Sequence, residues 1–148
     1  MIHDGLQLKG RLNIVVADAL GNIKDEREVD NLVVTTGKNF VASRMKDTTS
    51  SVMSHMAIGT DNTAAAAGDT TLGSESARVA LTSTTVTNND VVYVATFGAG
   101  TPSSAASITE AGIFNASSAG TMLCRTVFSV VSKGSQDSLS ITWTVTAS

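Results

Sequence analysis

Apolar and polar residues alternate with a period of two over much of the chain. In the first such run, Leu8–Val16, the apolar positions share one face and Lys9, Arg11 and Asn13 share the other. The last run, Leu139–Val145, repeats the pattern with Trp143 on the apolar face. Because the side chains of a strand point alternately to its two faces, both runs predict strands with one buried and one solvated face.

About eight strands are predicted, separated by turns rich in Gly, Asn, Asp and Ser. They are Leu8–Val16, Ile23–Val34, Val52–Gly59, Ser76–Thr87, Val91–Phe97, Ile108–Phe114, Met122–Val131 and Leu139–Val145. One short helix is predicted over Thr35–Met45, with Thr36 as its N-cap. Strands at this spacing that do not alternate with helices favour an all-β fold, a β-sandwich of jelly-roll type.

Three segments carry more specific expectations. Lys24–Glu28 is too charged to be buried and should face water or lie at a sheet edge. Val91–Phe97 is apolar on both faces, which is typical of a central strand. The outer faces of several strands carry threonine instead of charge, and such surfaces oppose the addition of a further strand less strongly. We therefore expect part of the surface to be covered in the working state.

Composition narrows the class of protein. The 148 residues fit one domain, which we place at 8–148 after an N-terminal arm of residues 1–7. Charged residues are only 16% and the net charge is −3, so no nucleic-acid partner is expected. No run of 18 apolar residues occurs, and hence no membrane partner is expected. The N-terminus has neither the basic start nor the apolar stretch of a signal peptide.

Candidate chemistry is sparse, and we expect no enzyme activity, no cofactor and no metal site. The two histidines, His3 and His55, have no ligand partners at short spacing, and Cys124 alternates with apolar residues as a buried thiol does. Glu110 is expected to pair with Arg78, Arg125 or backbone amides and not to act as an acid. The acidic residues among positions 25–30 lack the order of a calcium loop and are interpreted as a solvated edge.

Several stretches resemble small structural proteins of tailed-bacteriophage particles. They are Asn31–Phe40, Met56–Thr60, Ala64–Leu72, Thr96–Gly100, Ile108–Asn115 and Ser138–Val145, and the resemblance spans roughly residues 7 to 147. Among these proteins the chain resembles those of the head-decoration, or cement, type. The stretch Thr109–Phe114 also resembles an element of tail-fibre and collar proteins.

The resemblance implies a β-sandwich cement protein without catalytic residues. Such a protein binds the major capsid protein on the outer head, often as a homotrimer, and stabilises the shell against internal DNA pressure. Its place is the capsid surface of a virion assembled in the bacterial host cytoplasm. The alternative is a tail, neck or fibre component, in which case the protein could be a host-adsorption module. Candidate contact residues are Ile2, His3, Leu6 and Leu8, because Ile2 and Leu6 are apolar yet precede the first core strand.

Overall fold

The computed structural model describes residues 5–46 and 50–148. Within them the chain forms nine strands and one helix, so the predicted all-β fold with one short helix is confirmed. In chain order the elements are β1 (Leu8–Ala17), β2 (Ile23–Val33), α1 (Thr35–Arg44), β3 (His55–Gly59), β4 (Glu75–Ala80), β5 (Ser83–Thr87), β6 (Asp90–Phe97), β7 (Ala106–Phe114), β8 (Met122–Lys133) and β9 (Ser138–Ala147).

The ninth strand arises because the predicted strand Ser76–Thr87 is divided into β4 and β5. β4 pairs with β3, whereas β5 pairs with β6. The amide of Leu81 donates to the carbonyl of Ser54 at 2.9 Å, and the next amide, that of Thr82, donates to the carbonyl of Val94 at 2.7 Å. The chain therefore changes its partner strand between these two residues.

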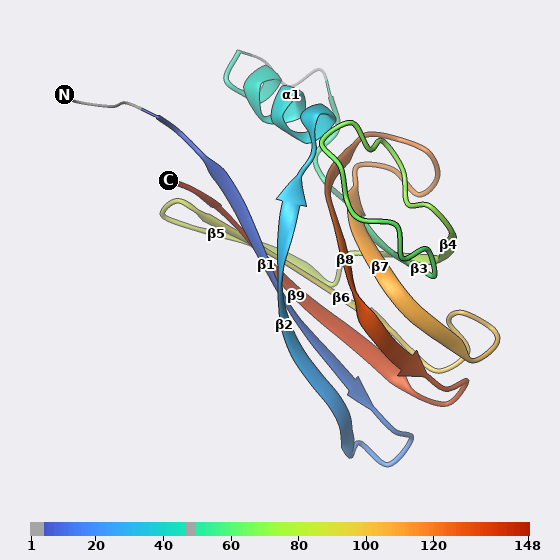
Figure 1. Cartoon of the computed structure of the whole chain (residues 1–148). Coiled ribbons are helices and arrows are strands. Elements are labelled where there is room, and N and C mark those ends of the chain that lie inside the picture. The colour runs from blue at the N-terminus through green and yellow to red at the C-terminus, as the bar shows by residue number, and fades with distance from the viewer. Residues whose placement is uncertain (1–4, 47–49) are drawn as a thin grey trace.

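All strands belong to one curled antiparallel sheet in the order β4-β3-β7-β8-β2-β1-β9-β6-β5. β2 connects its two halves, since it pairs with β1 along most of its length but with β8 only through Leu32 and Val33. We call β5-β6-β9-β1-β2 the β1 half and β4-β3-β7-β8 the β7 half. The two halves form two layers (Figure 1), and the strands at the ends of the order, β4 and β5, are consecutive in the chain.

The main core lies between the two halves. β9 contributes Trp143, Ile141 and Leu139, all fully buried, and the β7 half contributes Met56 and Ile113. The apolar face predicted for the last strand, with Trp143 as a core residue, is confirmed. Truncation of a buried large aromatic side chain to alanine destabilises a fold by about 3–5 kcal/mol.

A second, smaller cluster covers the opposite face of the β7 half. It consists of Val34, Ala57, Leu72, Phe114 and Met122. Leu72 comes from residues 60–74, the segment between β3 and β4, which we call the covering loop. Because this loop covers their outer face, β3 and β7 are buried on both sides. The strand predicted to be central, now β6, instead lies next to the edge strand β5.

The helix α1 lies at one end of the sandwich (Figure 1). Thr36 is not its N-cap: Val34 holds that position without a side-chain bond, and the Thr36 hydroxyl donates to the carbonyl of Met122 at 2.9 Å. A Cβ added to Gly37 would lie 2.1 Å from the carbonyl oxygen of Leu123, so glycine lets α1 pack closely against β8. Among the described residues, no helix has the length and apolar character needed to cross a bilayer.

Candidate functional site

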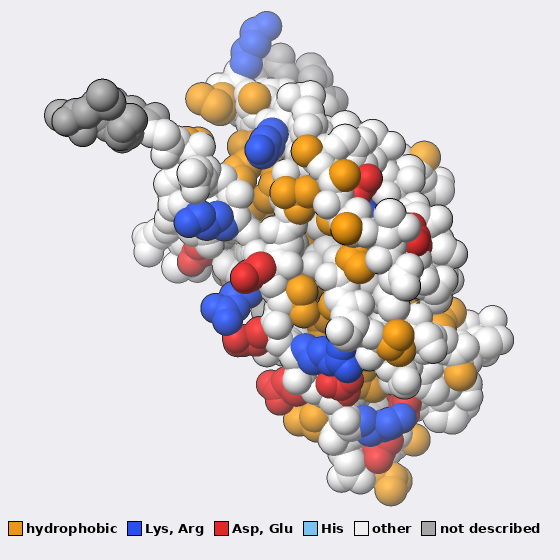
Figure 2. Space-filling view, viewed as in Figure 1, with side chains coloured by type: hydrophobic (Ala, Val, Ile, Leu, Met, Phe, Trp, Pro, Cys, Tyr) orange, Lys and Arg blue, Asp and Glu red, His pale blue; other side chains and the backbone are white. Residues whose placement is uncertain are grey.

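An apolar groove lies where α1 meets the start of β1. Its volume is about 430 Å³. It is lined by Leu6, Gln7, Leu8, Lys38, Val41, Ala42 and Met45, and we call it the arm–helix groove. Figure 2 shows hydrophobic side chains gathered in this region. Leu6 is 69% exposed and Met45 is 84% exposed, so two large apolar side chains face solvent on either side of one groove.

The local structure explains why the groove has this composition. Gln7 exchanges two backbone hydrogen bonds with Ser148, of 2.6 and 2.8 Å, which extends the pairing of β1 with β9 by one residue. On α1, Val41 and Met45 are four residues apart and therefore share a face. Val41 also packs against the main core, whereas Met45 at the end of the helix does not. The groove thus lies between α1 and the start of β1, and Met45 at its end does not pack against the main core.

Two of the four predicted contact residues line this groove. Leu6 is exposed, as a contact residue must be, whereas Leu8 is half-buried and packs against the core. Ile2 and His3 lie outside the described residues. The sequence did not predict that Val41 and Met45 line the groove. The apolar residues of the helix do not show which helix face the rest of the fold leaves uncovered.

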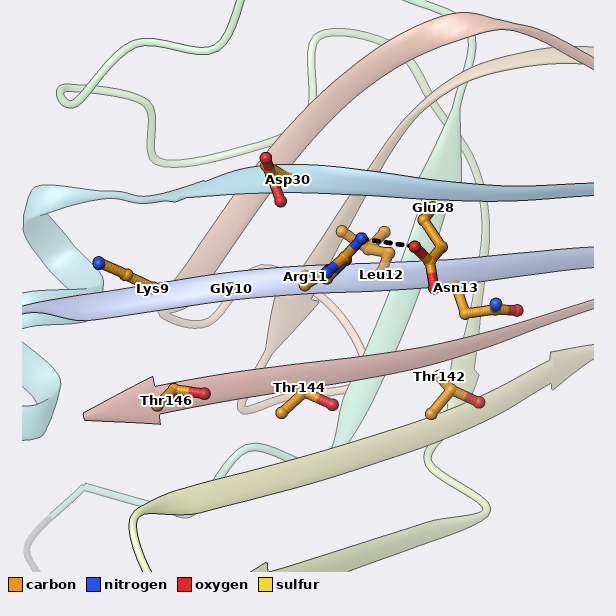
Figure 3. Close-up of a pocket in the computed structure, with 10 residues that line it drawn as sticks. All are labelled: Lys9, Gly10, Arg11, Leu12, Asn13, Glu28, Asp30, Thr142, Thr144 and Thr146. Carbon is orange, nitrogen blue, oxygen red and sulfur yellow. Dashed lines mark hydrogen bonds and ion pairs between the residues drawn. The ribbon is translucent and has the colours of Figure 1, made fainter. Parts of the chain in front are cut away.

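A second hollow lies on the outer face of the β1 half and has a volume of about 430 Å³. It is lined by Lys9, Gly10, Arg11, Leu12, Asn13, Glu28, Asp30, Thr142, Thr144 and Thr146 (Figure 3). Arg11 and Glu28 form an ion pair of 2.5 Å across β1 and β2, and both side chains are more than half exposed. Exposed pairs of this kind are screened by water and salt and hold a ligand or a fold only weakly. Figure 2 shows charges of both signs over this region.

The charged stretch of β2 lies where the sequence places it, at a solvated edge. Residues 25–30 pair with β1 on one side, but they have no partner in β8 on the other. Arg27 bridges the gap and donates to the carbonyls of Ser129 and Val130 at 2.7 and 2.8 Å. It also pairs with Asp25 at 2.9 Å. The acidic residues therefore belong to an edge, and no group of three or more potential metal ligands occurs among the residues that are described.

Glu110 is fully buried and accepts hydrogen bonds from backbone amides of the covering loop. The amides of Asp61, Gly73 and Ser74 donate to its carboxylate at 3.0, 2.8 and 2.7 Å, and the Arg125 guanidinium donates at 3.2 Å. The predicted pairing with an arginine and with backbone amides is confirmed. A buried carboxylate with this many donors holds the loop in place.

Arg125 extends the same network to the far side of the loop. Its guanidinium pairs with Asp69 at 2.9 Å and donates to the carbonyl of Thr63 at 3.1 Å. Arg78, the alternative partner considered for Glu110, instead pairs with Glu75 at 2.7 Å. Glu110 and Arg125 therefore hold the covering loop against β7 and β8.

The remaining reactive side chains also have structural surroundings. Cys124 is fully buried, and burial raises the pKa of its thiol to about 12. It is thus protonated at neutral pH and packs as a small apolar group, as predicted. His55 is half-buried, with its Nδ1 atom 2.8 Å from the hydroxyl of the neighbouring Ser54.

In the arm–helix groove, two exposed large apolar side chains, Leu6 and Met45, line one hollow. An exposed apolar patch on a small protein is typical of a binding surface for another macromolecule. No protein-family model, no curated protein and no solved structure matches this chain.

Proposed function

We propose that this protein is a non-enzymatic structural component of a tailed-bacteriophage particle, a cement protein that binds the outer face of the head. The proposal rests on the resemblance of the six sequence stretches to such proteins and on the form of the molecule. A two-layer sandwich with a solvated face of threonine and charge and with an apolar groove at one end is suited to adhesion to a larger surface.

The observation that carries the proposal is the arm–helix groove. Leu6 and Met45 present apolar area to solvent at a place where α1 and the start of β1 are both tied to the sandwich. Burial of a Leu or Met side chain contributes about 1.5–3 kcal/mol. The major capsid protein is the partner that this groove contacts in the proposed arrangement.

Cementing follows from mass action. A protein that binds the assembled shell but not its separate subunits shifts the equilibrium toward the shell, by an amount that grows with its free concentration. Each contact needs only an ordinary interface of about 1,600 Å², because the same contact recurs over the whole head. No chemical step is required of the protein.

The experiment is a reconstruction of the phage particle to which this chain is proposed to belong. We expect its density on the outer surface of the head, with the end that carries α1 turned toward the capsid protein. Density at the tail, neck or fibre would replace the proposal with the alternative that the resemblance also allows. A particle without this chain would refute both.

A further inference from the structure

The strand β5 is an edge strand whose whole length is open to solvent. It pairs with β6 on one side and ends the strand order on the other. All five of its residues are exposed, and Val86, its one large apolar residue, is 69% exposed. An edge strand leaves a row of backbone donors and acceptors without partners in the sheet.

β5 has none of the features that usually prevent the addition of another strand. Its sequence, Ser-Thr-Thr-Val-Thr, has no charge, proline or glycine, and the neighbouring residues Thr82, Asn88 and Asn89 are uncharged as well. β-branched residues such as these favour extended pairing. Native edges are normally protected by charged side chains, bulges or a covering element.

The other free stretches of edge are protected in this way. The free stretch of β2 carries both acidic and basic residues, and its Arg27 donates to the carbonyls of Ser129 and Val130 in β8. At the opposite end of the sheet, β4 carries the ion pair of Glu75 and Arg78. The free stretch of β8 around Ser129 and Val130 is also uncharged, but Arg27 covers it. Among the edges that the structure describes, β5 is therefore the one with neither charged side chains of its own nor a charged side chain that covers it.

We propose that β5 pairs with the β5 strand of a second copy of this chain, antiparallel and about a two-fold axis at Thr85. In this register Ser83 faces Thr87 of the second copy, and Thr84 faces Val86 of the second copy. A second copy fits because β5 is self-complementary: nowhere along the pair does one charge face a like charge. The same operation on β2 about Arg27 would place Glu26 opposite Glu28, an arrangement that destabilises cross-strand pairing.

The pairing joins the β1 halves of two copies into one continuous sheet. Thr84 and Val86 belong to the face of β5 that points toward the inside of the sandwich, since they pair with Tyr93 and Val91. Bringing the two copies together covers part of the exposed Val86 side chain. The contact is short, so the pair is weak and its population depends on concentration over about 10 µM to 1 mM.

The test measures the mass of the free protein by sedimentation equilibrium over that range of concentrations. We expect the weight-average mass to rise from 15.2 kDa toward twice that value. Thr85→Lys places two like charges opposite each other and should weaken association up to about fivefold, and Thr85→Glu should do the same. An equimolar mixture of the two variants should restore the pair, because Lys then faces Glu.

Thr142→Lys is the matched control. Thr142 is also exposed and lies on the same outer face as Thr85, but it belongs to the interior strand β9, and the substitution should leave association unchanged. Far-ultraviolet circular dichroism and thermal unfolding establish that each variant is folded. A wild-type monomer at every concentration overturns the proposal, and so does a trimer, which the resemblance implies. Equal losses in the Thr85→Lys and Thr142→Lys variants, or no recovery in the mixture, overturn it too.

Discussion

The guanidinium of Arg125 lies 3.1 Å from the carboxylate of Glu110, and both side chains are enclosed beneath the covering loop. The residues come from neighbouring strands, β8 and β7, but their remaining bonds are made to the loop. A buried ion pair stabilises a fold only when its other donors and acceptors are also satisfied. Here the loop satisfies them, so the pair and the loop depend on each other.

Glu110→Gln should destabilise the protein by about 3 kcal/mol, because it removes the fully buried counter-ion of the buried Arg125 charge. It also replaces one of the two carboxylate oxygens, which together accept three backbone amide hydrogen bonds, with an NH2 group that cannot accept them. Urea unfolding measures the loss, and limited proteolysis should show cleavage within the covering loop. The control is Glu28→Gln, which breaks the exposed pair with Arg11 and should cost less than about 1 kcal/mol. Equal losses in the two variants would contradict the role of the buried pair.

Gly37→Ala should loosen the contact between α1 and β8. The added methyl group would lie 2.1 Å from the backbone oxygen of Leu123, which cannot move without the strand. We expect a loss of about 1–3 kcal/mol in urea unfolding. Gly68→Ala serves as the comparison, since a Cβ there has no heavy atom within 4 Å, and it should change stability by less than about 1 kcal/mol. If the first variant is as stable as the second, α1 is not held as closely as described.

Asp137 should contribute to the loss of stability in acid. The side chain of Lys24, followed by the amide of Gly134, holds the pKa of this carboxyl below its usual 3.8. A carboxyl with a lowered pKa in the folded state stabilises the protein fully above the unfolded value, and this stability is lost as the pH falls through the folded value. Urea unfolding between about pH 2 and pH 6 should therefore show a shallower decline below pH 4 for Asp137→Asn than for the wild type.

Lys24→Gln should flatten the same acid limb in part, because it removes the largest cause of the lowered pKa of Asp137. Both variants should leave the slope above about pH 5 unchanged, where Asp137 is ionised in both states. An acid limb identical to that of the wild type in both variants would show that other carboxyls determine it.

Leu6→Ser and Met45→Ser should each weaken binding to phage heads about tenfold or more, if the arm–helix groove contacts the capsid protein. Co-sedimentation with heads that lack this chain measures the affinity. Leu20→Ser is the control: Leu20 is 87% exposed but lies in the turn between β1 and β2, at the end of β1 far from α1. A loss for Leu20→Ser as large as for the other two would place the contact elsewhere.

Part of the candidate site followed from the sequence. Leu6 was identified because an apolar residue ahead of the first core strand has no partner in the alternating pattern. Met45 could not be found in this way, because its exposure results from how α1 packs on β8, and that depends on the close approach at Gly37. Likewise, the partners of Glu110 are amides of a loop whose own sequence shows no periodicity.

Alternation of apolar and polar residues by itself determined the positions of strands such as β1 and β9, because each has one face in the core and one in water. Only the tertiary structure decided where a strand changes partner. Leu81 and Thr82 lie within one run of residues that is typical of a strand, so the change of partner from β3 to β6 leaves no mark in the sequence. Burial of β7 on both faces was decided in the same way. It depends on a small, polar loop held by Glu110 and Arg125, and contacts between residues distant in the chain leave no period in the sequence.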